Sequence, residues 1–172
     1  MSIDGVVYSF RVDRYGRGIR LAALVGDALP DRPSLQPGSP LPEISLTDTD
    51  GQPHPLSSYR GKVLLLDFWA VWCAPCRAEA PRLTRIYERF HDRGLAILGI
   101  NSGDSESEIK RFVAEFGMTW PQVMEAPDGP LHGLFRIRGW PTYFVVGKDG
   151  TILANHIDWE SLDGILESAL RE

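Results

Sequence analysis

The chain contains only two cysteines, Cys73 and Cys76, and the dipeptide Ala-Pro separates them. They lie where the apolar run of residues 63–69 gives way to a pattern with helical periodicity. Thiols three positions apart at the start of a helix lie on one face and can close a small disulfide. So short a loop constrains the unfolded chain little, which disfavours a purely structural role for the disulfide. The fold must therefore lead a buried strand into a helix whose first turn carries a redox-active dithiol.

Zinc sites also use paired thiols. A structural zinc ion needs two further ligands beside two cysteines. The histidines show no paired ligand spacing; they are His54, His91, His132 and His156. The sequence therefore predicts no metal, and it predicts no flavin, nucleotide or other cofactor.

Strand and helix patterns alternate through most of the chain. The predicted strands of the main sheet are residues 63–69, 95–100, 142–146 and 151–156, and a separate hairpin is predicted for residues 43–48 and 52–56. The predicted helices are residues 74–91, 106–116, 129–135 and a last helix around 162–169. A β-hairpin that follows βαβα units predicts a mixed central sheet with helices on both faces, an α/β fold.

Residues 1–37 stand apart from this pattern. Residues 5–12 alternate like a strand, and residues 19–25 are predicted to pair back on them as a hairpin. Five prolines within residues 27–42 predict an extended connector. The predicted organisation is an N-terminal β extension with a Pro-rich connector, residues 1–37, and a main domain, residues 38–172. The extension either packs on the main domain or belongs to a separate module or a partner-binding arm.

Charge and hydropathy limit the possible partners. The formal net charge of −5 disfavours nucleic acid as the main partner. No apolar stretch approaches the roughly 20 residues of a membrane span, so no transmembrane segment is predicted. The first residues lack the basic and apolar regions of a secretory signal. We expect a cytoplasmic monomer; the alternative is a periplasmic or extracytoplasmic protein whose export segment is absent from this sequence.

The region around the cysteines resembles a known family. Residues 68–77, Phe-Trp-Ala-Val-Trp-Cys-Ala-Pro-Cys-Arg, resemble the active site of the thioredoxin superfamily. The similarity to its TlpA/ResA-like thiol–disulfide oxidoreductases extends to residues 56–62, Glu79, Pro81 and residues 139–142. This resemblance begins near residue 38. It implies a thioredoxin-like three-layer α/β/α sandwich and thiol–disulfide exchange.

The two cysteines are predicted to have different roles. Backbone N–H groups and the dipole at the helix N-terminus favour an anion, so we expect a lowered pKa at Cys73, whose thiolate attacks a substrate disulfide. Cys76, one turn later and expected to be the more buried, resolves the mixed disulfide. No histidine lies between the cysteines to stabilise the thiolate further. The pair is therefore predicted to be a weak oxidant, and the protein to be a protein-disulfide reductase.

Two acids are candidate site residues. Asp67 lies within the predicted buried strand, so its pKa should be raised. The resemblance to thioredoxin implies that Asp67 accepts the proton of the buried cysteine; the alternative is a structural hydrogen-bonding role. Glu79 lies three residues after Cys76. The resemblance to ResA-like proteins implies that it tunes the thiols, and the alternative is an exposed acid that complements the helix dipole.

Three further residues are candidates for substrate binding. We expect a cis peptide bond before Pro141, facing the disulfide. The resemblance implies that the backbone before this proline pairs with an extended substrate chain. Trp140 would then face the substrate, unless it is a core or interface aromatic residue, and Trp72 is predicted to form an exposed docking surface.

The predicted partners are disulfide-containing protein substrates and an upstream thiol electron donor. One alternative is a thiol peroxidase, whose reactive cysteine usually follows a Thr or Ser by three positions; Ala70 at that place disfavours it. The other alternative is a non-catalytic docking module that binds an extended chain around Trp72, Trp140 and Pro141 without turnover.

Overall fold

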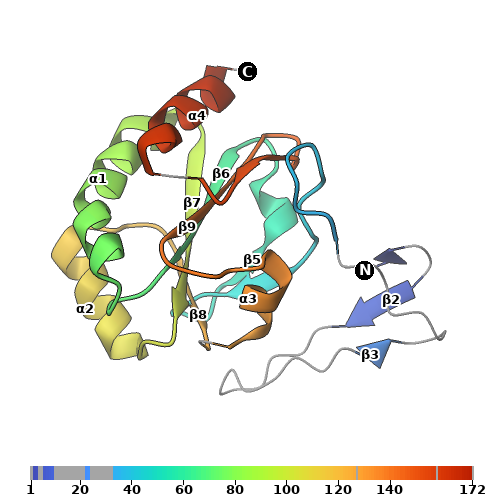
Figure 1. Ribbon diagram of the computed structural model, residues 1–172, viewed down its shortest axis with the longest axis horizontal. Coiled ribbons are helices and arrows are strands. Elements are labelled where there is room, and N and C mark those ends of the chain that lie inside the picture. Colours follow the sequence, from blue (N-terminus) through green and yellow to red (C-terminus); the bar gives the residue numbers. More distant parts are fainter. Residues whose placement is uncertain are drawn as a thin grey trace.

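A five-stranded mixed sheet forms the centre of the computed structural model (Figure 1). The structure describes residues 33–171 except 127 and 158, and only the backbone of residues 2–3, 6–9 and 22–23 before them. The strand order is β10-β9-β6-β7-β8. The strands are β6 Val63–Trp69, β7 Leu95–Ser102, β8 Gln122–Glu125, β9 Thr142–Val146 and β10 Ile152–Asn155.

The strand directions confirm the mixed sheet that the sequence predicts. β6, β7 and β8 are parallel, whereas β9 runs antiparallel to β6 and β10 antiparallel to β9. The sequence pattern does not predict β8. It is four residues long and follows Pro121, which is too little for a periodic signal.

Helices cover both faces of the sheet, as the three-layer prediction requires. They are α1 Ala74–Phe90, α2 Glu106–Phe116, α3 Pro130–Phe135 and α4 Trp159–Arg171. Buried side chains of α1, α2 and α4 pack on one face, and those of α3 pack on the other (Figure 1). Among the described helices, none combines the length and the apolar character needed to cross a membrane.

The central strand β6 places its side chains alternately in the two cores. Leu65 and Trp69 pack in the core under α1, and Leu66 and Phe68 pack in the core under α3. Because strand side chains alternate, Asp67 points to the same face as Leu65 and Trp69. The sequence of β6 therefore directs one carboxyl group into the apolar layer beneath α1.

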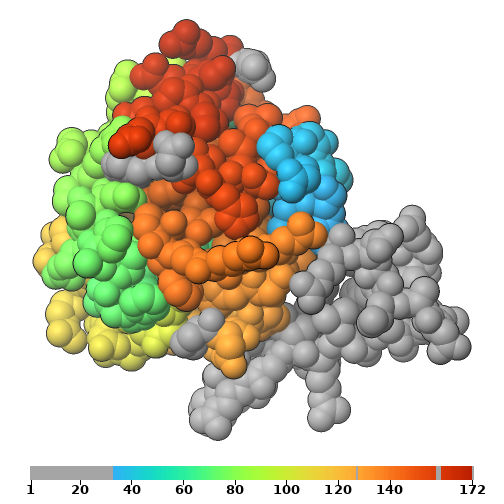
Figure 2. All heavy atoms as spheres, viewed as in Figure 1, coloured from blue at the N-terminus to red at the C-terminus, as the bar shows by residue number. Residues whose placement is uncertain are grey.

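Segments before β6 cover both edges of the sheet. The hairpin of β4 Ser45–Thr47 and β5 Pro53–Pro55 reaches β8, where the N–H of Thr49 donates to the Gln122 carbonyl at 2.8 Å. At the other edge, the N–H of Gly38 donates to the Ile152 carbonyl of β10 at 2.8 Å. Figure 2 shows this segment, coloured blue, lying against the orange-red region. Covered edges cannot pair with other chains.

The predicted N-terminal hairpin is present in the backbone pairing. Strands β1 Ser2–Ile3, β2 Val6–Ser9 and β3 Ala22–Ala23 form a three-stranded antiparallel sheet. The residues between β2 and β3, and residues 27–32 of the connector, lie outside the described residues. Leu35 is 2% exposed within the main core, so the connector's last part packs on the domain. The division at residues 37 and 38 stays a prediction.

Candidate active site

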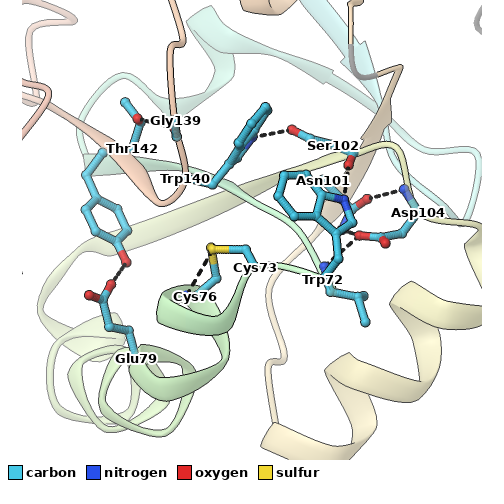
Figure 3. The surroundings of a disulfide bond; sticks show 12 residues. Trp72, Cys73, Cys76, Glu79, Asn101, Ser102, Asp104, Gly139, Trp140 and Thr142 are labelled. Carbon is cyan, nitrogen blue, oxygen red and sulfur yellow. Dashed lines mark hydrogen bonds between the residues drawn. A yellow bond between two sulfur atoms is a disulfide. The ribbon is translucent and has the colours of Figure 1, made fainter.

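The first turn of α1 carries a closed disulfide between Cys73 and Cys76, with an S–S distance of 2.07 Å (Figure 3). β6 ends at Trp69, and Cys73 is the N-cap of the helix that starts immediately afterwards. The N–H of Cys76 donates to the Sγ atom of Cys73 at 3.1 Å. Pro75 lies within the first two helical positions, where its missing N–H removes no helical hydrogen bond. The local sequence thus places both sulfur atoms at the positive end of a helix.

The expectation that Cys76 is the more buried cysteine is wrong. Cys73 is 4% exposed and Cys76 is 5% exposed. Both belong to the core cluster beneath α1, and Trp140 packs against that cluster. The reason is that both side chains pack in the same apolar layer and are joined by the closed disulfide. An incoming thiolate therefore finds little open surface at Cys73.

Asp67 lies beneath the disulfide in an apolar layer. Its side chain and that of Cys76 line one small cavity, together with Tyr143. Burial, with a smaller contribution from the negative charge of Glu79, raises the pKa of Asp67 to about 8. Within the described residues, its Oδ1 atom has no hydrogen-bond partner. The raised pKa agrees with the sequence-based expectation.

Glu79 and Tyr143 form a hydrogen-bonded pair beside this cavity. The Tyr143 hydroxyl donates to Oε2 of Glu79 at 2.8 Å (Figure 3). Burial raises the pKa of Glu79, against the opposing effects of this hydrogen bond and of the positive charge of Arg82. Glu79 is therefore half-buried and anchored, which differs from an exposed acid at a helix end.

Tyr143 is a site residue that the sequence reasoning missed. In the antiparallel pair of β9 and β6 it lies directly opposite Asp67. Burial, followed by the charges of Asp67 and Glu79, raises the pKa of Tyr143, so its hydroxyl stays protonated. The only signal in the sequence is a tyrosine in an otherwise apolar strand, and its partner depends on the strand register.

The peptide bond between Trp140 and Pro141 is cis, as the sequence predicts. The loop is closed by the Thr142 hydroxyl, which donates to the Gly139 carbonyl at 2.8 Å. Trp140 is half-buried, and its indole ring meets that of Trp72 edge-on, with 4.9 Å between ring centroids. The cis-proline loop is thereby joined to the residue that precedes Cys73 (Figure 3).

Trp72 is 57% exposed, as expected for a residue that meets a partner. The loop that carries it is held by the end of β7. The N–H of Val71 donates to Oδ2 of Asp104 at 2.6 Å, and the side-chain amide of Asn101 donates to the same oxygen at 2.8 Å. The sequence reasoning missed Asn101 and Asp104, although polar residues at the end of a buried strand are a usable signal.

No group of three or more His, Cys, Asp or Glu side chains is arranged to hold a metal ion in the described part of the chain. The Cys73–Cys76 disulfide gives the site thiol chemistry, beside one buried carboxyl group, one anchored glutamate and an aromatic surface.

Comparisons with known proteins point to the same chemistry. Residues 37–155 match the model of the AhpC/TSA family. The thiol-disulfide oxidoreductase ResA of Geobacillus kaustophilus is 33% identical over 141 residues, which cover 80% of this chain and 80% of the relative. ResA of Bacillus subtilis is 31% identical over 120 residues, which cover 70% of this chain and 66% of the relative.

Solved structures confirm the predicted thioredoxin-like fold. The thioredoxin domain of a thiol-disulfide oxidoreductase from Bacteroides vulgatus matches with a TM-score of 0.69 and 31% identity, covering 78% of this chain and 98% of that domain. A thiol:disulfide interchange protein of the thioredoxin family from Chlorobium tepidum matches with a TM-score of 0.68 and 28% identity, covering 84% and 99%.

Proposed function

The chain belongs to the AhpC/TSA family of thioredoxin-like proteins and is a thiol–disulfide oxidoreductase, and we propose that it reduces protein disulfides. The observation that carries the proposal is the Cys73–Cys76 disulfide at the N-terminus of α1. The Cys73 thiolate attacks one sulfur of the substrate disulfide, which releases a substrate thiolate and forms a mixed disulfide. Cys76 then attacks the Cys73 sulfur, closes the internal disulfide and releases the second substrate thiolate.

Asp67 supplies the proton chemistry in this proposal. The Cys76 thiol must lose its proton before it attacks, and Asp67 is the carboxyl group that shares its cavity. A base with a pKa near 8 both accepts and returns a proton near neutral pH. Tyr143, which lies opposite Asp67 in the sheet, and Glu79 form a hydrogen-bonded pair beside this cavity.

The surroundings of Cys73 support the proposed direction of electron flow. The helix N-terminus stabilises its thiolate, but no cationic side chain lies between the two cysteines to add to this effect. Known potentials run from about −270 mV for thioredoxin to about −120 mV for a strong oxidant. We place this pair near the thioredoxin end, with a separate thiol protein as electron donor. Equilibration with glutathione buffers measures the potential, and a value near the oxidant end would reverse the direction.

The partners and the location are parts of the same proposal. The substrates are proteins with accessible disulfides, which meet the surface formed by Trp72, Trp140 and Pro141. We retain the cytoplasm as the predicted compartment and an extracytoplasmic one as the alternative. Fractionation of cells that express the tagged protein from its native gene distinguishes the two.

The decisive test is a trap with Cys76→Ser. The variant should hold substrates as mixed disulfides through Cys73, and dithiothreitol should reduce these disulfides and release the substrates. Cys73→Ser is the matched control and should hold none. A docking module would give equal, thiol-independent capture with both variants. Peroxide consumption by the wild type in the absence of any protein disulfide would instead support the peroxidase alternative.

A further inference from the structure

The indole groups of Trp72 and Trp140 are anchored at one residue. Ser102 is the last residue of β7 and is fully buried. Its carbonyl accepts a hydrogen bond from Nε1 of Trp72 at 3.2 Å, and its hydroxyl accepts one from Nε1 of Trp140 at 2.7 Å (Figure 3). Two rings from different loops are thereby held in edge-on contact beside the nucleophilic cysteine.

The hydroxyl of Ser102 has a second partner, His132 of α3. Its Oγ atom lies 2.7 Å from Nε2 of His132, and both side chains are buried. An indole N–H can only donate, so the serine oxygen accepts from Trp140 and its own hydrogen is free to point at His132. This arrangement satisfies the indole N–H, the serine hydroxyl and Nε2 of His132 when Nε2 carries no proton; the proton of the neutral ring is then on the buried Nδ1, which has no hydrogen-bond partner within the described residues.

The surroundings of His132 favour that neutral state. The ring packs against Phe68 of β6 and against the ring of Trp140, at centroid distances of 6.4 Å and 5.7 Å. Burial lowers the pKa of His132, with partly opposing effects from the backbone of Ala126 and from the negative charge of Asp128. In the tautomer with unprotonated Nε2, a directed chain of hydrogen bonds runs from Trp140 through Ser102 to His132 and ends on the second helical layer.

Trp140 packs against the core cluster that holds Cys73, and Cys73 is only 4% exposed although it must meet a substrate. Trp72 precedes Cys73 directly, and Trp140 precedes the cis-proline. Any reagent that approaches Cys73 from the side of these residues meets two rings that cannot rotate away without breaking hydrogen bonds. A bulky reagent is hindered more than a small one.

We propose that Ser102 and His132 are positioning residues that fix Trp140 against Trp72, so that the two rings form a wall which restricts access to Cys73. The inference rests on the proposed function for the role of Cys73 as nucleophile. It assigns to the wall a selectivity for small thiols and disulfides over larger ones.

The experiment measures how fast thiols reduce the disulfide of the full-length protein. Two reductants are compared, dithiothreitol as the slim one and a short reduced peptide with two cysteines as the bulky one, each in excess. Samples are quenched in acid and alkylated, and the reduced fraction is read by mass. The variants are Ser102→Ala, Trp140→Phe, His132→Phe and His132→Gln. Ser58→Ala, which removes an exposed hydroxyl bonded to the Pro55 carbonyl at 2.7 Å, is the control.

Loss of any one hydrogen bond of the chain should free Trp140. Ser102→Ala, Trp140→Phe and His132→Phe should each raise the peptide rate by about three- to tenfold, the effect of one lost hydrogen bond. The dithiothreitol rate should rise less than about twofold, since a slim reagent is barely hindered. His132→Gln keeps an acceptor for the Ser102 hydroxyl, so both of its reduction rates should stay near those of the wild type. The rates of Ser58→Ala should also stay there. The double variant Ser102→Ala, Trp140→Phe should be reduced by the peptide at the same rate as either single variant, because both remove the same hydrogen bond.

A second readout follows the wall directly. Coupling between Trp72 and Trp140 contributes to the circular dichroism of the folded protein, and Ser102→Ala should weaken it while leaving the helical signal intact. Unchanged or lower peptide rates in all three variants would overturn the proposal. If Ser102→Ala does not fold, Trp140→Phe and His132→Phe decide. Chemical reduction needs no natural substrate. A change in these rates would therefore support the wall even if the protein fails to reduce protein disulfides.

Discussion

At the scale of single residues, Asp67 links stability to pH. Burial raises its pKa to about 8, from 3.8 for an unperturbed aspartate. The folded state therefore holds this proton more tightly than the unfolded state, so the stabilisation is complete below pH 4 and is lost as the pH rises towards 8. Its contribution to the free energy of unfolding should fall by up to about 1.4 kcal/mol per pH unit in this window.

Asp67→Asn should remove this dependence. The difference in unfolding free energy between variant and wild type should grow in favour of the variant from pH 5 to pH 8, whatever constant offset the amide introduces. Urea unfolding of both oxidised proteins at several pH values gives the difference directly. A pH-independent difference would show that Asp67 titrates normally and would remove the basis for its role as proton acceptor.

Tyr143 connects the two acids, and Tyr143→Phe isolates its hydroxyl. The hydrogen bond from Tyr143 lowers the pKa of Glu79 against the effect of burial, so the variant should have a higher Glu79 pKa. It should also lose about 1 kcal/mol of stability for the lost hydrogen bond. Carbon-13 NMR of labelled glutamate measures the pKa. A pKa that stays in place would mean that the pair does not form in solution.

At the scale of elements, α2 shows how sequence sets a helix boundary. The N–H of Ser105 donates to Glu108 and the N–H of Glu108 donates to the Ser105 hydroxyl, a complete capping box. Ser105→Ala should lower the unfolding free energy by about 1 kcal/mol. Glu108→Gln should lower the unfolding free energy by clearly less, because glutamine serves equally in a capping box. Urea unfolding at pH 7 tests the order, and a larger loss for Glu108→Gln than for Ser105→Ala would show that the charge of Glu108 near the helix N-terminus matters more than the cap.

Elements with a long periodic pattern were predictable, and short or long-range features were not. The apolar run of β6 and the amphipathic pattern of α1 predict both elements nearly to the residue. β8 carries too few residues for a pattern. The register of β9 against β6 places Tyr143 opposite Asp67, and the hydrogen bonds at Ser102 depend on how two loops and α3 meet the end of β7. Sequence thus located the chemistry, while the groups that support it required the fold.

At the scale of the whole molecule, the segment before β4 completes the domain. Leu35 and Leu41 are buried in the core under α3, and the Leu35 carbonyl accepts a hydrogen bond from the Asn155 side chain at 2.6 Å. The N–H of Leu41 donates to the Gly150 carbonyl at 2.9 Å. These contacts tie residues 35–41 to the β9–β10 hairpin, the part of the molecule where blue and orange-red surfaces meet in Figure 2.

Two truncations test where the domain begins. A chain that starts at residue 33 should keep the stability of the full-length protein, because it retains every contact just described. A chain that starts at residue 43 should lose at least about 3 kcal/mol, since burying a leucine side chain contributes about 1.5–3 kcal/mol and two are removed. Its melting temperature should fall by roughly 10 °C. Leu35→Ala in the full-length protein is the matched point variant and should cost about 2–5 kcal/mol. Equal stability of both truncations would place the start of the domain at β4. A loss already at residue 33 would show that the N-terminal sheet packs on the domain.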